Sequence, residues 1–110
     1  MANTPERKVK DKVTAVLRER GAYYFFPPAN GFGRAGIPDI VGCYLGQFIA
    51  IECKAGKNTA TRLQLREIDN IIKAGGVALV VNEHNINEIE QILSQLEKRH
   101  DGQTTKGTTA

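Results

Sequence analysis

The sequence predicts an α/β fold, in which helices flank a mixed β-sheet in the order α-β-β-β-α-β-α. Three segments carry apolar residues at helical spacing, and shorter apolar runs bounded by glycine, proline or asparagine lie between them. A strand at 48–54, a helix at 61–73 and a strand at 77–81 form a strand–helix–strand step. Such a step implies two parallel strands joined by a right-handed crossover. Helices packed on the sheet then give an α/β sandwich.

The chain of 110 residues is expected to form one domain over 1–100. The last segment, 101–110, has no apolar residue except its final alanine and is predicted to be a disordered tail. No apolar run approaches the ~20 residues that a membrane span needs, and the N-terminus lacks an apolar signal region. We therefore expect a cytoplasmic protein with no membrane partner. A net charge of +3 permits a polyanionic partner without requiring one.

The first helix begins with a capping residue and a proline. Thr4 can accept the cap hydrogen bond, Pro5 suits the first helical position, and Gly21 ends the helix. Glu6 lies on the same stripe as the apolar Val9, so it is expected to point inward. The alternative is that Glu6 only complements the helix dipole from the first turn.

An aromatic strand and a glycine-rich segment follow this helix. The strand at 22–28 contains four aromatics in a row, of which alternation can place only about two in the core. The segment 29–36, with three glycines and Arg34, is predicted to be a flexible loop. Loops of this length are often functional, although a plain connector remains an equal alternative.

An apolar hairpin over 36–57 carries three charges at its open end. Its turn is predicted at Gly46 and Gln47. In the second strand the alternate residues Ile49, Ile51 and Cys53 form a core face, whereas Ala50, Glu52 and Lys54 share the opposite face. A hairpin centred on this turn pairs position 39 with about 53 or 54. Asp39 and Glu52 can therefore approach one another.

The remaining elements complete the sheet and its helices. Thr59 or Thr61 is expected to cap the helix ending near Lys73, whose first turn places Gln64 inward. The run VALVV at 77–81 is predicted to be a fully buried strand. A last helix begins after Asn85 or Asn87. Glu6 and Gln64, both on first helical turns, could join the charges of the hairpin.

Two carboxylates brought together repel one another, and their burial costs several kcal/mol unless a cation compensates. Magnesium prefers oxygen ligands, takes few carboxylates and leaves positions for phosphate oxygens. Lys54 beside such an ion could stabilise charge on a phosphoryl transition state or help to activate a water. The structural alternative is a salt bridge between Lys54 and Asp39 or Glu52.

Gly36-Ile37-Pro38-Asp39 followed by Glu52-Cys53-Lys54 resembles the Pro-Asp, spacer, Glu-x-Lys signature of the PD-(D/E)xK nucleases, which have a restriction-endonuclease-like core. Four further features agree: Glu6 on a preceding helix, Gly36 before the Pro-Asp pair, Gly56-Lys57 after the motif, and Thr61 with Gln64 opening the next helix. Together these look like the virus-type replication-repair nuclease (VRR-NUC) domain, and archaeal Holliday junction resolvases are similar in pattern. The small size is like that of phage and bacterial members.

The resemblance implies a role for each matching residue. Asp39, Glu52 and the backbone carbonyl of Cys53 would bind Mg²⁺ or Mn²⁺, and Glu6 would bind it directly or through a water. Lys54 would be the catalytic lysine, and Gln64 would position that lysine or the water. The implied activity is hydrolysis of DNA phosphodiester bonds.

Small members of the family resemble homodimeric endonucleases selective for four-way junctions. Arg34, Lys57 and Arg62 flank the proposed site and are candidate DNA contacts. Two alternatives remain open. One is a restriction-like, single-strand or flap nuclease with the same core. The other is a catalytically silent nucleic-acid-binding module, which the intact Asp39, Glu52 and Lys54 argue against.

Overall fold

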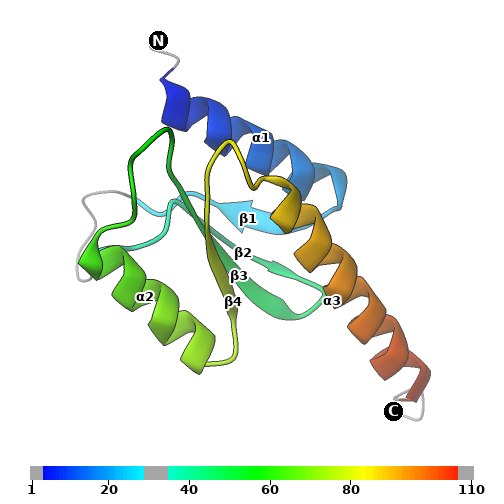
Figure 1. The fold of residues 1–110 in the computed structure, drawn as a ribbon. Helices are drawn as coiled ribbons and strands as arrows, with labels where there is room; N and C mark the ends of the chain where they lie inside the picture. Colours follow the sequence, from blue (N-terminus) through cyan, green and yellow to red (C-terminus); the bar gives the residue numbers. More distant parts are fainter. Residues whose placement is uncertain (1–3, 29–34, 107–110) are drawn as a thin grey trace.

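A computed structural model describes residues 4–28 and 35–106. The observed order of elements is the predicted one, and Figure 1 shows how they are arranged. The helices and strands are α1 (Pro5–Glu19), β1 (Tyr23–Phe25), β2 (Ile40–Tyr44), β3 (Gln47–Cys53), α2 (Arg62–Lys73), β4 (Val77–Val81) and α3 (Asn87–Lys106).

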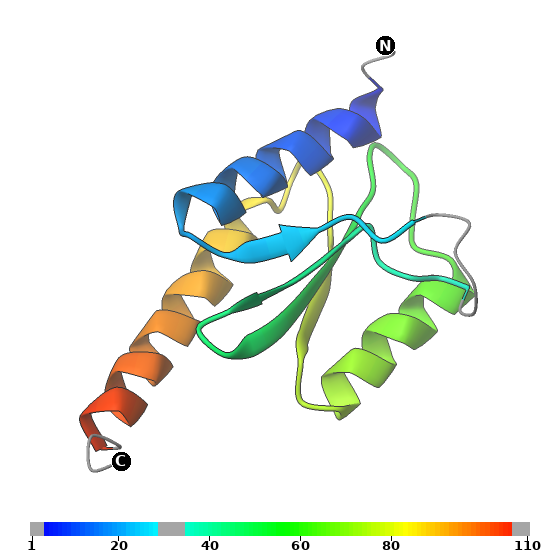
Figure 2. The same cartoon turned by 180° about the vertical axis from the view of Figure 1, so that it is seen from behind.

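The four described strands form one mixed sheet in the order β1-β2-β3-β4. The first three are antiparallel neighbours, and β4 pairs with β3 in parallel, as the strand–helix–strand step predicts. Helices α1 and α3 cover one face of the sheet and α2 covers the other (Figures 1 and 2). β4 lies at the edge of this sheet and is mostly half-buried, so the prediction of a fully buried strand is wrong. A continuous apolar run does not show how many neighbours a strand has.

The core lies between the sheet and the α1–α3 layer. Alternation in β3 directs Ile49, Ile51 and Cys53 into this core, as predicted. The helices contribute apolar stripes at intervals of three or four residues, which is the spacing that keeps side chains on one helix face. These buried residues are Val9, Val13 and Leu17 of α1, and Ile89, Leu93 and Leu96 of α3.

The hairpin turn lies one residue earlier than predicted. Leu45 and Gly46 both have positive φ, 52° and 82°, and Gln47 is already the first residue of β3. Two such residues match the twist of a hairpin, which is why this pair forms the turn. The resulting register pairs Ile40 with Ile51. Asp39 therefore lies beside Glu52, rather than opposite position 53 or 54.

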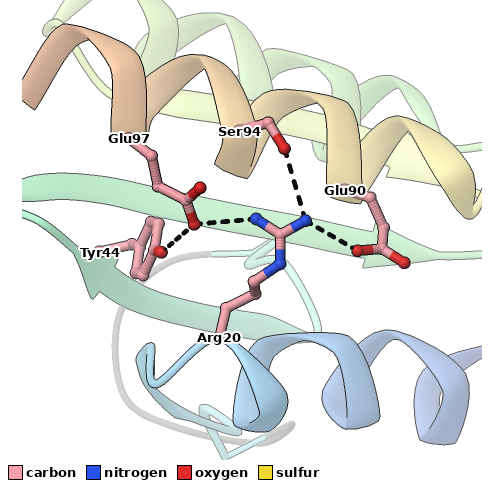
Figure 3. A network of polar contacts seen from close by, with 5 residues as sticks. All are labelled: Arg20, Tyr44, Glu90, Ser94 and Glu97. Carbon is pink, nitrogen blue, oxygen red and sulfur yellow. Dashed lines mark hydrogen bonds and ion pairs between the residues drawn. The ribbon is translucent and has the colours of Figure 1, made fainter.

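A polar network fixes the end of α1 against α3 and the sheet (Figure 3). The guanidinium of Arg20 donates to Glu97 at 2.8 Å and to Glu90 at 2.9 Å. The Tyr44 hydroxyl of β2 donates to the same carboxylate of Glu97. Burial, and then the hydrogen bond to Glu97, raise the pKa of Tyr44, so its hydroxyl keeps its proton. Because α1 is held at this end, the orientation of its first turn at the other end is also restricted.

The aromatic segment is less buried than expected. Tyr24 is half-buried beneath α1, but Tyr23, Phe25 and Phe26 are 69%, 48% and 50% exposed. β1 is a three-residue edge strand running beside α1 (Figure 2), and within the described residues α2 packs on β3 and β4 instead of on β1. The second face of β1 is consequently open.

The final helix extends into the segment that sequence analysis expects to be disordered. α3 continues to Lys106, since adding a residue to an existing helix is far easier than starting a new one. Residues 107–110 lie outside the described part of the chain. Across 4–28 and 35–106, no helix has the length and apolar character needed to cross a membrane.

Candidate active site

The charged residues of the sequence motif meet at the open end of the β2–β3 hairpin. Asp39 precedes β2, Glu52 and Cys53 end β3, and Lys54 follows directly. In both views the first turn of α1 lies beside the loop that follows β3 (Figures 1 and 2). The first turn of α2 supplies Gln64 from the opposite layer. Four elements that are separate in sequence therefore converge at one corner of the sheet.

Asp39 is held by the backbone of the neighbouring strand. Its Oδ2 accepts a hydrogen bond from the Cys53 N–H at 2.9 Å. The bond crosses the end of the hairpin, where the ladder of β2 and β3 stops at Ile40 and Ile51. It therefore fixes the carboxylate of Asp39 close to that of Glu52.

Glu52 is buried among groups that partly offset its charge. Glu52 is 1% exposed, and its Oε2 accepts a hydrogen bond from Gln64 Nε2 at 2.9 Å. Its other oxygen, Oε1, is also buried and has no hydrogen-bond partner among the described residues. Burial and the charge of Asp39 raise the pKa of Glu52 to about 7, although Lys54 acts in the opposite direction. A buried carboxylate with one unsatisfied oxygen is expected to gain most from a cation.

Lys54 forms the ion pair that the structural alternative proposes, with Glu52 rather than Asp39. The distance from Nζ to Glu52 Oε2 is 3.4 Å, and the lysine side chain is only 13% exposed. Its backbone N–H donates to the carbonyl of Val81 on β4 at 2.9 Å. This contact and a catalytic role are compatible, because the same contact holds the ammonium beside the carboxylates.

Gln64 joins the site through a capping box. The Thr61 hydroxyl accepts from the Gln64 N–H at 3.2 Å, and Gln64 Oε1 accepts from the Thr61 N–H at 2.8 Å. The amide oxygen is thus used by the cap, and the amide nitrogen faces Glu52. Sequence analysis leaves Thr59 or Thr61 as the cap and expects Gln64 to hold the lysine or a water. The structure has Thr61 as the cap and places the Gln64 amide on the glutamate.

Glu6 lies near the carboxylates, in the first turn of α1. It is half-buried, and its charge contributes to the raised pKa of Glu52. It lines one pocket together with Asp39, Thr4, Arg7 and Lys10. Its inward orientation therefore agrees with the stripe that sequence analysis assigns to it.

Two of the three predicted DNA contacts lie within the described residues. Lys57, in the loop after the motif, and Arg62, at the first position of α2, are both exposed at this end of the molecule. Arg34 lies outside the described residues. Lys10 of α1 lines the pocket beside Asp39.

Gly36, which sequence analysis names only as part of the signature, is a positioning residue in the structure. It has φ +80°, and a Cβ at this position would lie 2.5 Å from the backbone oxygen of Leu63 in the first turn of α2. The segment leading to Asp39 is therefore packed directly on the helix end that carries Gln64. A glycine three residues before an aspartate was the available signal, but a spacing does not reveal what the glycine touches.

The donors fit a hard divalent cation held by few protein ligands. Asp39 and Glu52 supply carboxylate oxygens, and the unpartnered Oε1 of Glu52 has capacity for one more contact. Burial raises the pKa of the Cys53 thiol to about 12, so the backbone carbonyl is the suitable donor of that residue. The described residues contain no cluster of three or more histidine, cysteine or acidic side chains that could hold a metal. Two carboxylates and one carbonyl are a suitable set of protein ligands for magnesium, which usually keeps several waters.

A comparison with protein families decides the relationship of this chain. A family model described as archaeal Holliday junction resolvase matches residues 3–106. The protein belongs to the archaeal Holliday junction resolvase family. The resemblance to PD-(D/E)xK nucleases, read from Gly36 to Lys54, is thereby confirmed.

Two further comparisons agree with membership of the archaeal Holliday junction resolvase family. The phage protein "Putative nuclease p44", from Acyrthosiphon pisum secondary endosymbiont phage 1, is 31% identical over 87 residues. That match covers 76% of this chain and 89% of the relative. A solved structure described as a VRR_NUC domain matches with a TM-score of 0.62 at 22% identity. It covers 83% of this chain and 96% of that one, and it confirms the predicted fold. Together these findings support a nuclease.

Proposed function

We propose that this protein is a Mg²⁺- or Mn²⁺-dependent DNA endonuclease that hydrolyses phosphodiester bonds in branched DNA, most notably four-way junctions. The observation that carries the proposal is the buried Glu52, which lies between Lys54 and Gln64, beside Asp39, and keeps one oxygen unpartnered. A buried carboxylate with an unpartnered oxygen is costly for a purely structural domain. It is suited to hold a cation, which can in turn bind a phosphate.

Each residue of the site has a distinct part in the proposed hydrolysis. Asp39, Glu52 and the Cys53 carbonyl would hold the cation, with Glu6 directly or through a water. When bound, the cation would polarise a phosphate oxygen and lower the pKa of an attacking water. The Cys53 N–H keeps Asp39 in place at 2.9 Å, so little rearrangement is needed at this ligand.

Lys54 would act on the charge of the phosphate, and Gln64 on the orientation of Glu52. The Lys54 ammonium, 3.4 Å from Glu52, would lie next to the scissile phosphate and stabilise the negative charge that develops there. Gln64 is a positioning residue, because its amide holds Glu52 and is itself held by the helix cap. Lys57 and Arg62 would neutralise phosphates on either side of the cut.

A homodimer is part of the proposal, because symmetric cutting of a four-way junction needs two sites related by a two-fold axis. One face of the β1–β2–β3 sheet supports it. Tyr23 pairs with Cys43, and Cys43 pairs with Phe48, so these residues form one row across the sheet. Tyr23, Cys43 and Phe48 are all exposed. A second copy packed on this row would bury two aromatic rings.

Cleavage assays would test the activity. The protein would be incubated with linear duplex, flap and four-way junction DNA of the same sequence, with magnesium, manganese, calcium or EDTA. We expect cleavage of the junction with magnesium or manganese, little turnover with calcium, and none with EDTA. Full activity in EDTA would contradict the metal dependence. Equal rates on linear and branched DNA would contradict the substrate preference but not the nuclease.

Light scattering would test the assembly separately. We expect the mass of a dimer at micromolar concentration, and the mass of a monomer for Phe48→Asp, which replaces an aromatic ring of the exposed row by a charge. Glu88→Ala on the exposed face of α3 is the matched control and should stay dimeric. A monomeric wild-type protein would remove the dimer from the proposal.

A further inference from the structure

An exposed aromatic ring and a lysine form a pair beside the carboxylates. The ammonium of Lys10 lies 4.2 Å from the centre of the Phe26 ring, within the range of a cation–π contact. The Phe26 ring is 50% exposed and touches the half-buried Tyr24, with 6.0 Å between ring centres. The ring therefore has contacts on one side and is open to solvent on another.

This pair is continuous with the active site. Lys10 lines the same pocket as Glu6 and Asp39. Phe26 thus lies one side chain away from the metal-binding carboxylates, on the side of the first turn of α1.

The neighbouring phenylalanine has a different environment. Phe25 lies one residue before Phe26 and is exposed to a similar extent, 48%. Its ring packs beside Tyr23, with 6.3 Å between centres, on the open sheet face. Tyr23 and Tyr24 point to opposite faces of β1, and Phe25 contacts the first whereas Phe26 contacts the second, so the two phenylalanine rings lie on opposite sides of the chain. Of the two rings, Phe26 is the one that contacts Lys10, which lines the pocket.

We propose that Phe26 and Lys10 form a nucleotide subsite that takes one unpaired base of the DNA strand whose phosphodiester lies at Asp39 and Glu52. The inference rests on the proposed nuclease function and specifies its substrate. A phenyl ring stacks on any base, and the ammonium binds the phosphate of the same nucleotide. A base inside a duplex is already stacked on its neighbours and is not available to the ring.

The subsite predicts which branched substrates are preferred. A strand with an unpaired nucleotide next to the cut, as at a flap or at a branch point whose terminal base pair has opened, offers a free base. A fully paired duplex offers none unless it is first unstacked, which costs a few kcal/mol. Selectivity would come from the availability of the base and not from its identity, since every base presents a stacking surface.

Binding experiments in EDTA would test this inference without depending on cleavage. Two duplexes of equal length would be compared, one fully paired and one with a single unpaired nucleotide. Phe26→Leu keeps the apolar bulk but removes the aromatic face. We expect it to weaken binding of the unpaired DNA by roughly tenfold and to leave the paired duplex unchanged. Phe26→Trp should retain the affinity for both.

Phe25→Leu is the matched control, because it makes the same substitution at the adjacent, equally exposed ring. It should change neither affinity, and melting temperatures would show that all variants fold. Lys10→Gln should reduce the salt dependence of binding by about one phosphate contact on the unpaired DNA. A 5-iodouracil placed at the unpaired position should crosslink to Phe26 on irradiation, as a base stacked on an aromatic ring does.

Three results would overturn the subsite while leaving the nuclease in place. These are an equal effect of Phe26→Leu on both duplexes, no effect on either, or a crosslink that maps to another residue. Wild-type protein that binds neither DNA would remove the proposed function, and the subsite with it.

Discussion

Gln64 donates a hydrogen bond from α2 to Glu52 at the end of β3, with 2.9 Å between Nε2 and Oε2. The side-chain amide of Gln64 cannot flip without losing a hydrogen bond, because its oxygen accepts from the Thr61 N–H in the capping box of α2. A local helix signal and a contact in the candidate active site are therefore made by one side chain. The first turn of α2 orients the carboxylate on which the proposed metal site depends.

Replacement of Gln64 by glutamate separates these two roles. Gln64→Glu keeps an oxygen for the Thr61 N–H, so the helix cap is retained. It also places a carboxylate oxygen where the amide donated to Glu52, and repulsion should raise the pKa of Glu52 further. We expect cleavage at limiting magnesium to fall by about 10- to 100-fold, as is typical when a group that holds a metal ligand is changed.

Magnesium titrations of the cleavage rate, with thermal melting as a fold control, would measure the effect of this variant. Gln64→Ala loses both the side-chain bond to the Thr61 N–H and the donor to Glu52, and it should also lower stability by about 1 kcal/mol. A Gln64→Glu variant that cleaves like the wild type at every magnesium concentration would show that the contact has no part in metal binding.

The buried Glu52 predicts a pH dependence of stability. Its pKa in the folded protein is about 7, against an ordinary value of 4.5, with burial as the main cause. The folded state therefore holds this proton more tightly than the unfolded state does. Stability without metal should fall as the pH rises from 4.5 through about 7, by up to about 3 kcal/mol.

Denaturant unfolding at pH 5 and pH 8 in EDTA would measure the fall, with Glu52→Gln as the reference that cannot titrate. We expect the difference between wild type and Glu52→Gln to be larger at pH 8 than at pH 5. Magnesium should stabilise the wild type at pH 8, since a cation favours the ionised carboxylate. A pH-independent difference between the two proteins would be evidence against the raised pKa.

Two substitutions at the motif should remove activity without unfolding the protein. Asp39→Asn keeps an oxygen that can accept the Cys53 N–H, and Lys54→Ala removes the side chain that places an ammonium beside Glu52. We expect each to lower the cleavage rate by roughly 100- to 1,000-fold, the effect typical of removing a group that stabilises transition-state charge. Melting temperatures should change little.

The surface ion pair between Lys73 and Asp69 on α2, at 2.9 Å, provides matched controls. Asp69→Asn and Lys73→Ala make the same chemical changes at exposed positions, and both should cleave like the wild type. If Asp39→Asn or Lys54→Ala unfolds, the ion pair at the site is structural rather than catalytic.

Gly36→Ala should displace the segment that carries Asp39. The new Cβ would meet the Leu63 backbone at 2.5 Å, in a conformation that already disfavours a side chain. Gly21 is the matched control: its φ is +79°, close to the +80° of Gly36, and its Cβ would meet nothing within 4 Å. We expect Gly21→Ala to cost about 1 kcal/mol, and Gly36→Ala to cost about 1–3 kcal/mol more.

Chemical unfolding would give these stabilities, and the cleavage assay would show the local effect. Gly36→Ala should slow cleavage even at temperatures where it is fully folded, whereas Gly21→Ala should not. Equal stabilities for the two variants would mean that the loop can move away from α2 without strain.

The sequence predicted the elements where a local signal existed. Thr4 and Pro5 mark the start of α1, and the alternation of Ile49, Ile51 and Cys53 marks the core face of β3. The prediction failed where the answer depended on neighbours in space. The run VALVV did not reveal that β4 lies at an edge, and the four aromatics did not reveal how little of β1 is covered.

The sequence by itself determined which residues could form the site, because Asp39, Glu52, Lys54 and Gln64 are specified by spacing and by the periods of strand and helix. Only the tertiary structure decided how they meet. A turn at Leu45 and Gly46 brought Asp39 beside Glu52, and the cap at Thr61 directed the Gln64 amide to that carboxylate. Local patterns fix the direction in which a side chain points, whereas contacts between distant segments depend on register and packing, which sequence periodicity does not contain.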